Sequence, residues 1–529
     1  MYAADWPTQS GSPGREGWAK SERVLSKDNI RDLKTLYTFR PESTPSPSLS
    51  APVIDGNLIT YRGFKEMLVF SANSSRVFSV DADLNKLIWE SRLDGGANGI
   101  AGSSPGGPCS GAMSSPVIMA GSSSATMHFA AEAGRNASAT GARRRPSPYL
   151  PPLTETLYPL LPTTLTQLNA MYTVSATGSL HILNSSTGED LLPPTPFLPA
   201  GAKVTSLNLR DNVVYATTAD GCDGKQNALY AIDLLSSDKH VRSFVASRGG
   251  FSGSGGTSIG SDGTIFVQVA SAPDDKPGHT HQTVLALTPK DLKIKGYFTP
   301  RSKELGAKNL SSPGITPIVF PWHGKNLVLA GFADGRLYIL NADTLGGPDH
   351  RTSLFETEPI AARGKKYDGS GFRGTFSSWP DVDGDKRWFY APVVGPVDGA
   401  VLGFRLESNN GQPELEQVWT SRSMISPAPA VVANGMIFAL SSGNSPRLAK
   451  KNGRPYTTAE KAAMAKPAVL YALDAITGRE LYSSGDVLGI PASPSGLAVA
   501  NSRVYFPGLD GRMYCFGLPQ TQPQLAEQH

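Results

Sequence analysis

The stretch Val469-Leu470-Tyr471-Ala472-Leu473-Asp474-Ala475-Ile476-Thr477-Gly478-Arg479-Glu480-Leu481-Tyr482 decides the fold of this 529-residue chain. It predicts an apolar β-strand, a tight Thr-Gly turn and a second strand. Weaker copies are centred on Val77–Asp81, Leu180–Asn184, Leu229–Asp233, Val284–Leu287, Leu337–Asn341, Val401–Phe404 and Met513–Phe516. Self-similarity at a period of roughly 40–50 residues is typical of the blades of a β-propeller.

Two more kinds of strand precede these copies. Alternating apolar residues predict partner strands at Asn57–Gly63, Asn212–Thr218, Thr264–Ala270, Asn326–Phe332, Arg387–Val393, Gly435–Gly443 and Arg503–Gly508. A third kind of strand, rich in Ser, Thr and Pro, is predicted at Leu49–Ile54, Met113–Met119, Ser311–Phe320, Ile425–Val432 and Ile490–Val499.

The fold class follows from this count of strands. Four strands in each of eight repeats predict an all-β, eight-bladed β-propeller with four-stranded antiparallel blades. Only Thr457–Met464 has a helical pattern. An array of β-sandwiches is the rival architecture, but sandwiches do not repeat one consensus so evenly.

The two ends of the chain predict how the ring closes. The last repeat ends at Leu518 without an outer strand, whereas Leu33–Arg40 is a strand that no repeat uses. We expect this N-terminal strand to pair beside Arg512–Phe516, which would remove the open edge. Because neighbouring blades share a core, residues 1–529 should form one domain, interrupted at 134–168 by a low-complexity insertion.

Composition excludes several classes of function. The net charge of +4 is small and its Lys and Arg are scattered, which gives no support for nucleic-acid binding. No apolar stretch is long enough to span a membrane. The chain contains three cysteines and no C-x-x-C-H motif, so a covalently attached haem is excluded. The opening Met1–Trp6 is typical of a mature secreted or periplasmic protein, and we expect a monomer.

The N-terminal region also carries a family resemblance. The chain opens with Asp5-Trp6-Pro7-Thr8 and continues with Asn29-Ile30-Arg31-Asp32-Leu33 ahead of the predicted closing strand. Together with the blade consensus, these motifs resemble the quinoprotein alcohol dehydrogenase-like superfamily, which is built from PQQ-binding-like propeller repeats. The resemblance implies a periplasmic or secreted oxidoreductase that uses pyrroloquinoline quinone (PQQ) and calcium to oxidise a small or polymeric alcohol. Electrons would pass to a separate carrier, because no haem is attached.

Two departures from the family pattern leave an alternative open. Dehydrogenases of this family carry two adjacent cysteines over the quinone, whereas the corresponding loop here contains Cys109 alone. Gly443-Asn444-Ser445-Pro446 resembles the segment that supplies an asparagine ligand to calcium, but it lies in a later blade than in the family. The alternative is a non-catalytic propeller that binds a protein or a glycan, so the sequence leaves enzymatic activity open.

The predicted binding site lies where the loops between blades converge on one face of the ring. These loops contain the candidate ligand-binding residues Arg62, Cys109, Lys203, Arg248, Lys308, Arg373 and Asn444. Several cations around one funnel suit a polyanion such as a tricarboxylate quinone. Arg373 is the strongest candidate, because the flanking Gly371 and Gly374 permit close approach of a ligand. The glycine-rich Gly249–Gly256 could hold an anion with its backbone N–H groups or could be a flexible connection.

Three other patterns have both a functional and a structural interpretation. The spacing of Asp381, Asp383 and Asp385 is compatible with a set of calcium ligands. A hairpin turn rich in Asp and Gly would account for the same residue types. His279 and His281 could bind zinc or copper, or could lie on an exposed loop. Cys109 and Cys222 could form a disulfide if their loops meet, and Cys515 is predicted to be a core residue.

Overall fold

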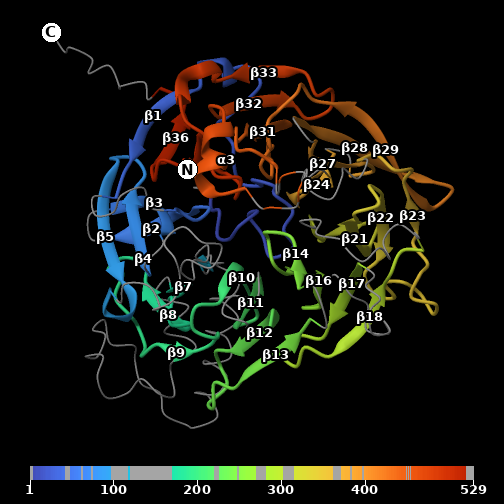
Figure 1. The fold of residues 1–529 in the computed structure, drawn as a ribbon, viewed down its shortest axis with the longest axis horizontal. Coiled ribbons are helices and arrows are strands. Elements are labelled where there is room, and N and C mark those ends of the chain that lie inside the picture. The colour runs from blue at the N-terminus through green and yellow to red at the C-terminus, as the bar shows by residue number, and fades with distance from the viewer. Residues whose placement is uncertain are drawn as a thin grey trace, which may run out of the picture.

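Eight antiparallel sheets form a closed ring around a common axis (Figure 1). The prediction of an all-β, eight-bladed propeller is confirmed. This arrangement comes from a computed structural model, which describes residues 4–41, 48–60, 63–72, 75–96, 117–118, 170–219, 226–246, 250–269, 282–301, 315–361, 371–381, 384–395, 398–447, 450, 452, 454 and 456–519. The insertion predicted at 134–168 lies outside these residues, and the assignment of the whole chain to one domain stays a prediction.

The strands of each blade follow one another along the chain. Blade 1 contains β2 (Val53–Thr60), β3 (Gly63–Ala72), β4 (Arg76–Asp81) and β5 (Lys86–Arg92), and blade 2 contains β6 (Val117–Ile118), β7 (Ala170–Val174), β8 (Ser179–Asn184) and β9 (Thr195–Pro196). Blade 3 contains β10 (Lys203–Arg210), β11 (Val213–Ala219), β12 (Ala228–Asp233) and β13 (Val241–Val245), and blade 4 contains β14 (Phe251–Ser252), β15 (Ser258–Ile259), β16 (Ile265–Val269), β17 (Thr283–Leu287) and β18 (Ile294–Phe298).

The second half of the ring repeats this order. Blade 5 contains β20 (Ile318–Trp322), β21 (Lys325–Gly331), β22 (Leu337–Asn341) and β23 (Phe355–Glu356), and blade 6 contains β24 (Gly371–Phe372), β26 (Ser377–Pro380), β27 (Arg387–Val394), β28 (Gly399–Asn409) and β29 (Gln412–Thr420). Blade 7 contains β30 (Val431–Ala433), β31 (Met436–Ser441), β32 (Val469–Asp474) and β33 (Glu480–Ser483). Blade 8 contains β34 (Ala498–Ala500), β35 (Arg503–Pro507), β36 (Met513–Gly517) and the N-terminal β1 (Lys34–Phe39).

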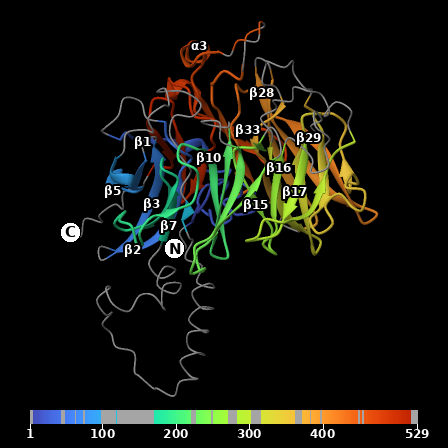
Figure 2. The same cartoon turned by 60° about the horizontal axis from the view of Figure 1, so that its bottom comes forward.

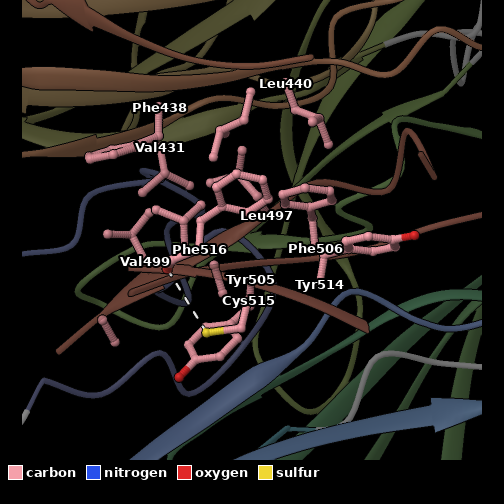
Figure 3. Packing of buried hydrophobic residues seen from close by; sticks show 14 of the residues in the cluster. Val431, Phe438, Leu440, Leu497, Val499, Tyr505, Phe506, Tyr514, Cys515 and Phe516 are labelled. Carbon is pink, nitrogen blue, oxygen red and sulfur yellow. Dashed lines mark hydrogen bonds between the residues drawn. The ribbon is translucent and has the colours of Figure 1, made fainter. Parts of the chain in front are cut away.

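The N-terminal strand closes the ring as predicted. β1 pairs antiparallel with β36, with Lys34 opposite Gly517 and Phe39 opposite Met513. The large cluster of buried side chains around this joint spans blades 7, 8 and 1, and Figure 3 shows part of it around Phe506 and Phe516. Cys515 is fully buried in this cluster, which confirms it as a core residue.

Middle strands are largely apolar because each blade is covered on both faces by its neighbours. All six residues of β31 (M-I-F-A-L-S) are buried, whereas the outer strand β29 alternates buried and exposed residues at several positions. A strand that is buried on both faces has no polar face and therefore reads as a continuous apolar run. This burial explains why the second and third strands of the repeat gave the clearest sequence signal.

Two of the predicted Pro-rich strands were too long. Ile425–Val432 forms a strand only from Val431, and Ile490–Val499 only from Ala498. Proline has no N–H group to donate to a β-ladder, and both segments contain two prolines before the strand begins. These segments cross one face of the ring before entering their blades, and they therefore line the site described below.

The strand predicted at Asn57–Gly63 was also wrong. β2 extends to Thr60 and β3 begins at Gly63, so the predicted segment covers the end of one strand and the start of the next. The second strand of blade 1 is the apolar β3, and no predicted strand covers it beyond Gly63. The first blade diverges from the consensus spacing, and the repeat therefore placed its hairpin incorrectly.

The Thr-Gly turns of the consensus are fixed by tryptophans from the preceding blade. The indole Nε1 of Trp419 in blade 6 donates to the carbonyl of Ala475 in blade 7 at 3.1 Å. A Cβ added at Gly478 would lie 2.6 Å from the Trp419 ring, and one at Gly188 would lie 2.4 Å from the ring of Trp89. Glycine is required at both turns because any side chain would overlap the ring.

The segment before β1 fills the channel along the propeller axis (Figure 1). Trp6 pairs with Ile54 in blade 1 and Trp18 pairs with Val432 in blade 7. Hydrogen bonds also connect residues 4–22 to blades 3, 4, 5, 6 and 8. The Asp-Trp-Pro-Thr motif therefore lies at the centre of the ring, where it packs against inner strands.

One helix stands apart from the ring. α3 (Thr458–Met464) lies on one face of the propeller (Figure 2), and its capping box is formed by Thr457 and Glu460. The helix predicted at Thr457–Met464 is therefore confirmed. Among the described residues, no helix is long and apolar enough to cross a membrane.

Candidate functional site

A cavity of about 470 Å³ opens at one end of the axial channel. Its described walls come from the N-terminal segment and from blades 1, 3, 4, 6, 7 and 8. The lining residues are Gln9, Ser48, Leu49, Ser50, Ala51, Lys203, Val204, Ala219, Gly253, Ser254, Arg373, Gly374, Ser426, Pro427, Pro429, Asn444, Ser445, Ser493, Pro494 and Ser495. This volume is in the range of small-molecule sites in proteins. We refer to it as the axial cavity.

Arg373 lies where blade 6 begins. It separates β24 from β25 (Gly374–Thr375), and β25 pairs in parallel with β19 (Ile315–Thr316) beside blade 5. A Cβ on Gly374 would lie 2.6 Å from the ring of Pro429 in blade 7, so this position requires glycine. The backbone around Arg373 is therefore fixed by neighbours on both sides.

Lys203 and Asn444 reach the same cavity from other blades. Lys203 is the first residue of β10, the inner strand of blade 3, and it is exposed. Asn444 follows β31 and its backbone N–H donates to the Ser442 hydroxyl at 3.3 Å. The structure thus brings together Lys203, Arg373 and Asn444, which the sequence analysis had placed in one funnel.

The N-terminal segment forms the floor of the cavity. Gln9 is 4% exposed and its amide Nε2 donates to the carbonyl of Ser495 in blade 8 at 3.0 Å. Beneath it, the fully buried guanidinium of Arg15 donates to the Thr8 hydroxyl and to the carbonyls of Gln9 and Leu207. Burial lowers the pKa of Arg15 to about 9, since the charged form is removed from water. Arg15 therefore fixes the backbone of the cavity floor.

The described lining is cationic and rich in hydroxyl groups. It contains the cations Lys203 and Arg373, and among the described lining residues there is no Asp or Glu. Burial lowers the pKa of the Arg373 guanidinium, because its charged form is less well hydrated than in water. Serine residues that belong to or lead into blades 1, 4, 7 and 8 contribute hydroxyl groups to the lining. This chemistry suits acidic oxygen groups and hydroxyls, and it does not suit a cation.

Several predicted site residues lie outside the described part of the chain. These are Arg62, Cys109, Arg248 and Lys308 among the binding candidates, Asp383 among the metal candidates, and also Cys222, His279 and His281. Of Gly249–Gly256, Gly253 lines the cavity, and the N–H of Gly255 donates to the Thr316 hydroxyl at 3.0 Å. That N–H is therefore used in packing between blades and not in an anion cradle.

The predicted calcium loop lies away from the axial cavity. Asp381 and Asp385 belong to the turn between β26 and β27, and the Asp381 carbonyl accepts from the N–H of Gly384 at 3.0 Å. Arg373 lies at the other end of β27, where Phe372 pairs with Val393. An eight-residue strand separates the two sites by more than about 20 Å. In the described part of the chain, no group of three His, Cys, Asp or Glu residues is arranged to hold a metal ion.

Sequence reasoning missed the floor and the serine-rich rim of the cavity. Gln9 belongs to a segment without periodicity, so nothing local indicates that it lies on the axis. The rim residues Ser48, Ser426, Ser493 and Ser495 occur next to proline in the segments that lead into inner strands, and Ser50 is two residues from Pro52. This recurrent Ser/Pro pattern was visible, and it could have indicated which loops converge on the axis.

Comparisons with known proteins support the fold and no more. No protein-family model and no curated protein matches the chain. The structure is similar to quinohemoprotein alcohol dehydrogenase ADHIIG from Pseudomonas putida HK5, with a TM-score of 0.57 and 10% identity over 98% of this chain and 81% of that chain. The structure is also similar to a europium-containing methanol dehydrogenase, with a TM-score of 0.56 and 11% identity over 97% of this chain and 98% of that chain. Similarity to Sqt1 from Saccharomyces cerevisiae has a TM-score of 0.50 and 12% identity over 92% of this chain and 99% of that chain.

These similarities extend over nearly the whole chain, as the sequence motifs led us to expect. The resemblance to the quinoprotein propellers is therefore confirmed at the level of the eight-bladed fold. At 10% to 12% identity, the shared architecture carries no residue role from one protein to another.

Proposed function

We propose that this protein binds a small anionic ligand with two or more acidic groups in the axial cavity. The observation that carries the proposal is the pair of cations, Lys203 and Arg373, on the wall of one 470 Å³ cavity whose described lining contains no carboxylate. Arginine and lysine pair with carboxylates and phosphates through charge-assisted hydrogen bonds. Two such groups on one ligand would explain why cations from blades 3 and 6 face the same space.

Burial makes Arg373 the stronger of the two. Burial lowers its pKa, and an acidic group of a ligand beside it would favour the charged form. Lys203 is more exposed, so its attraction for an anion is weakened more by water and salt.

A second candidate is alcohol oxidation with PQQ and calcium, favoured by similarity to the two dehydrogenases over nearly the whole chain. The three carboxylates of this quinone fit the cations of the axial cavity. Calcium requires several oxygen ligands, commonly carboxylates, whereas the described lining offers the side-chain amides of Gln9 and Asn444 and serine hydroxyls. The described lining also lacks a carboxylate base and an aromatic ring. The described residues thus fit the acidic part of the quinone and not its metal.

The first experiment measures anion binding by isothermal titration calorimetry with citrate and with PQQ. Arg373→Ala should weaken binding by about 1.5–3 kcal/mol, the usual contribution of a hydrogen bond to a charged group. Lys203→Ala should weaken it less, because the side chain is more exposed. Binding by the unaltered protein should also weaken as salt is added.

Lys86→Ala is the matched control, because it removes one exposed positive charge from the outer strand β5. It should leave the affinity unchanged. Equal effects of Lys86→Ala and Arg373→Ala, or no binding of any di- or tricarboxylate, would contradict the proposal.

The second candidate has its own test. The absorbance spectrum of the protein is recorded after PQQ and Ca²⁺ are added, followed by reduction of a dye with small and polymeric alcohols. Dye reduction that requires both additions would support a dehydrogenase. Binding of PQQ without dye reduction would leave anion binding as the function.

The remaining expectations from the sequence stay predictions. These are a periplasmic or secreted location, a monomeric state, calcium binding by the loop with Asp381, Asp383 and Asp385, and an alternative protein or glycan partner. Size-exclusion chromatography with light scattering tests the monomeric state.

A further inference from the structure

Gln9 contains a buried hydrogen-bond acceptor that the protein leaves unused. Its Nε2 donates to the Ser495 carbonyl, and this bond fixes which end of the amide is the oxygen. The Oε1 atom is buried, and no donor in the described part of the chain reaches it. Leaving a buried acceptor without a partner costs free energy, so an unused acceptor in a binding cavity calls for an explanation.

Gln9 lies between two neighbouring spaces that share lining residues. It lines the axial cavity and also a small space of about 10 Å³, which we call the extension and which Trp6 and Ser10 of the N-terminal segment help to line. Ser495, Ala51 and Pro429 line both spaces, and Trp6 and Gly496 close the extension. A space of this size holds one water molecule or one hydroxyl group.

The other side-chain hydroxyls that line the extension already have partners. Ser495 accepts from the Ser493 hydroxyl at 3.0 Å, whereas Gln9 Oε1 accepts from no donor in the described residues. The hydroxyl of Ser10, which also lines the extension, is 3.0 Å from the Thr375 hydroxyl and is paired with it. Arg15 donates to the Gln9 carbonyl and so fixes the backbone beneath the amide. The position of the Oε1 atom is thus set by Ser495 on one side and by Arg15 on the other.

We propose that the ligand is a hydroxylated polycarboxylic acid, with a hydroxyl group that enters the extension and donates to Gln9 Oε1. The inference rests on the proposed function, because Lys203 and Arg373 supply the partners for the acidic groups. A carboxylate has no proton to donate at neutral pH and would be repelled by an amide oxygen. A hydroxyl group supplies the missing donor without a charge, and the serines of the rim can accept and donate to further hydroxyls.

The test compares acids that differ by hydroxyl groups alone. Citrate and tricarballylate share three carboxylates, and only citrate has a hydroxyl group. Tartrate and succinate form a second pair. We expect the unaltered protein to bind citrate and tartrate roughly three- to tenfold more tightly than their deoxygenated partners, the effect of one neutral hydrogen bond.

Gln9→Met removes the acceptor while keeping an unbranched side chain of similar length. It should abolish the preference for the hydroxylated acid, even if it changes both affinities. Gln268→Met is the matched control. Gln268 is fully buried, donates to the Gly331 carbonyl at 3.0 Å and has an Oε1 without a donor in the described structure, but it does not line the axial cavity. This control should keep the preference of the unaltered protein.

Each outcome separates this inference from the proposed function. Equal binding of citrate and tricarballylate, or a preference that survives Gln9→Met, would overturn the inference while leaving anion binding intact, and a water molecule would then be the occupant of the extension. Absence of binding by all four acids would overturn both.

Discussion

Single residues of the blade consensus make the same contact in different blades. The Tyr338 hydroxyl donates to Asp334 at 2.9 Å, and the Tyr514 hydroxyl donates to Asp510 at 3.0 Å. Each Asp also accepts from the backbone N–H two residues later, so the turn and the third strand are held by one carboxylate. The repeated residues of the consensus therefore form the same hydrogen bonds in different blades. This shared structural role explains why the pattern recurs along the chain.

At the scale of the residue, we predict that Gly478→Ala destabilises the protein more than Gly411→Ala. Both glycines have positive φ angles, +71° and +79°, but only Gly478 faces a ring, that of Trp419. Gly411→Ala should cost about 1 kcal/mol from backbone strain alone. Gly478→Ala should cost roughly 1–3 kcal/mol more, because Trp419 must move. Urea unfolding compares the two variants, and equal midpoints would contradict the role given to Trp419.

Between elements, the joint of blades 1 and 8 contains a buried ionic network. Arg503 in β35 donates to Glu66 in β3 at 2.8 Å and to Asp83 at 2.6 Å, and the Tyr505 hydroxyl donates to Glu66 at 3.2 Å. Burial raises the pKa of Glu66 to about 7, although the charge of Arg503 opposes the shift. The strand pairing of β1 and this network close the same gap in the ring.

The raised pKa of Glu66 predicts a pH dependence of stability. Between the ordinary glutamate pKa of about 4.3 and the folded value of about 7, the folded state binds more protons than the unfolded state. The contribution of Glu66 is therefore full below about pH 4.3 and is lost as the pH rises through 7. Relative to Glu66→Gln, the unfolding free energy should fall by roughly 1 kcal/mol per pH unit in this window. Parallel pH profiles for the two proteins would show that Arg503 holds Glu66 ionised throughout.

At the scale of the whole molecule, the N-terminal region has two separate structural roles. Residues 4–22 fill the axial channel and form the floor of the cavity, and β1 then completes blade 8. Because an unpaired β36 would be an apolar edge, loss of β1 exposes the ring to association with other chains. Loss of the axial segment removes hydrogen bonds to blades on every side of the channel.

Two N-terminal deletions distinguish the role of the axial segment from the role of β1. Removing residues 1–25 should lower the melting temperature and abolish ligand binding, because the cavity loses its floor. Removing residues 1–40 should lower the melting temperature further and cause aggregation, since blade 8 also loses its outer strand. Scanning calorimetry and size-exclusion chromatography measure both effects. Equal melting temperatures for the two deletions would mean that β1 contributes little to closure.

The sequence by itself determined the repeat, the number of blades, the closing strand and helix α3. The repeat, the number of blades and helix α3 depend on contacts between neighbours in the chain: alternation along a strand, a turn of fixed chemistry and a capping box. The closing strand pairs with the far end of the chain, and it was predicted because the last repeat lacks an outer strand and no repeat uses Leu33–Arg40. The same reasoning failed where proline interrupts the inner strands and where blade 1 departs from the consensus spacing. Apart from the closing strand, local pattern was informative where the hydrogen-bond partners are close together in the chain.

Only the tertiary structure decided which residues meet on the axis. Sequence reasoning expected Lys203, Arg373 and Asn444 to converge because loops on one face of a propeller must do so, and the structure places all three in one cavity. It could not place Gln9, whose segment has no periodicity and whose partner Ser495 lies 486 residues away. The described walls of the axial cavity come from the N-terminal segment and six blades, so the composition of the cavity depends on closure of the ring and on no single stretch of chain.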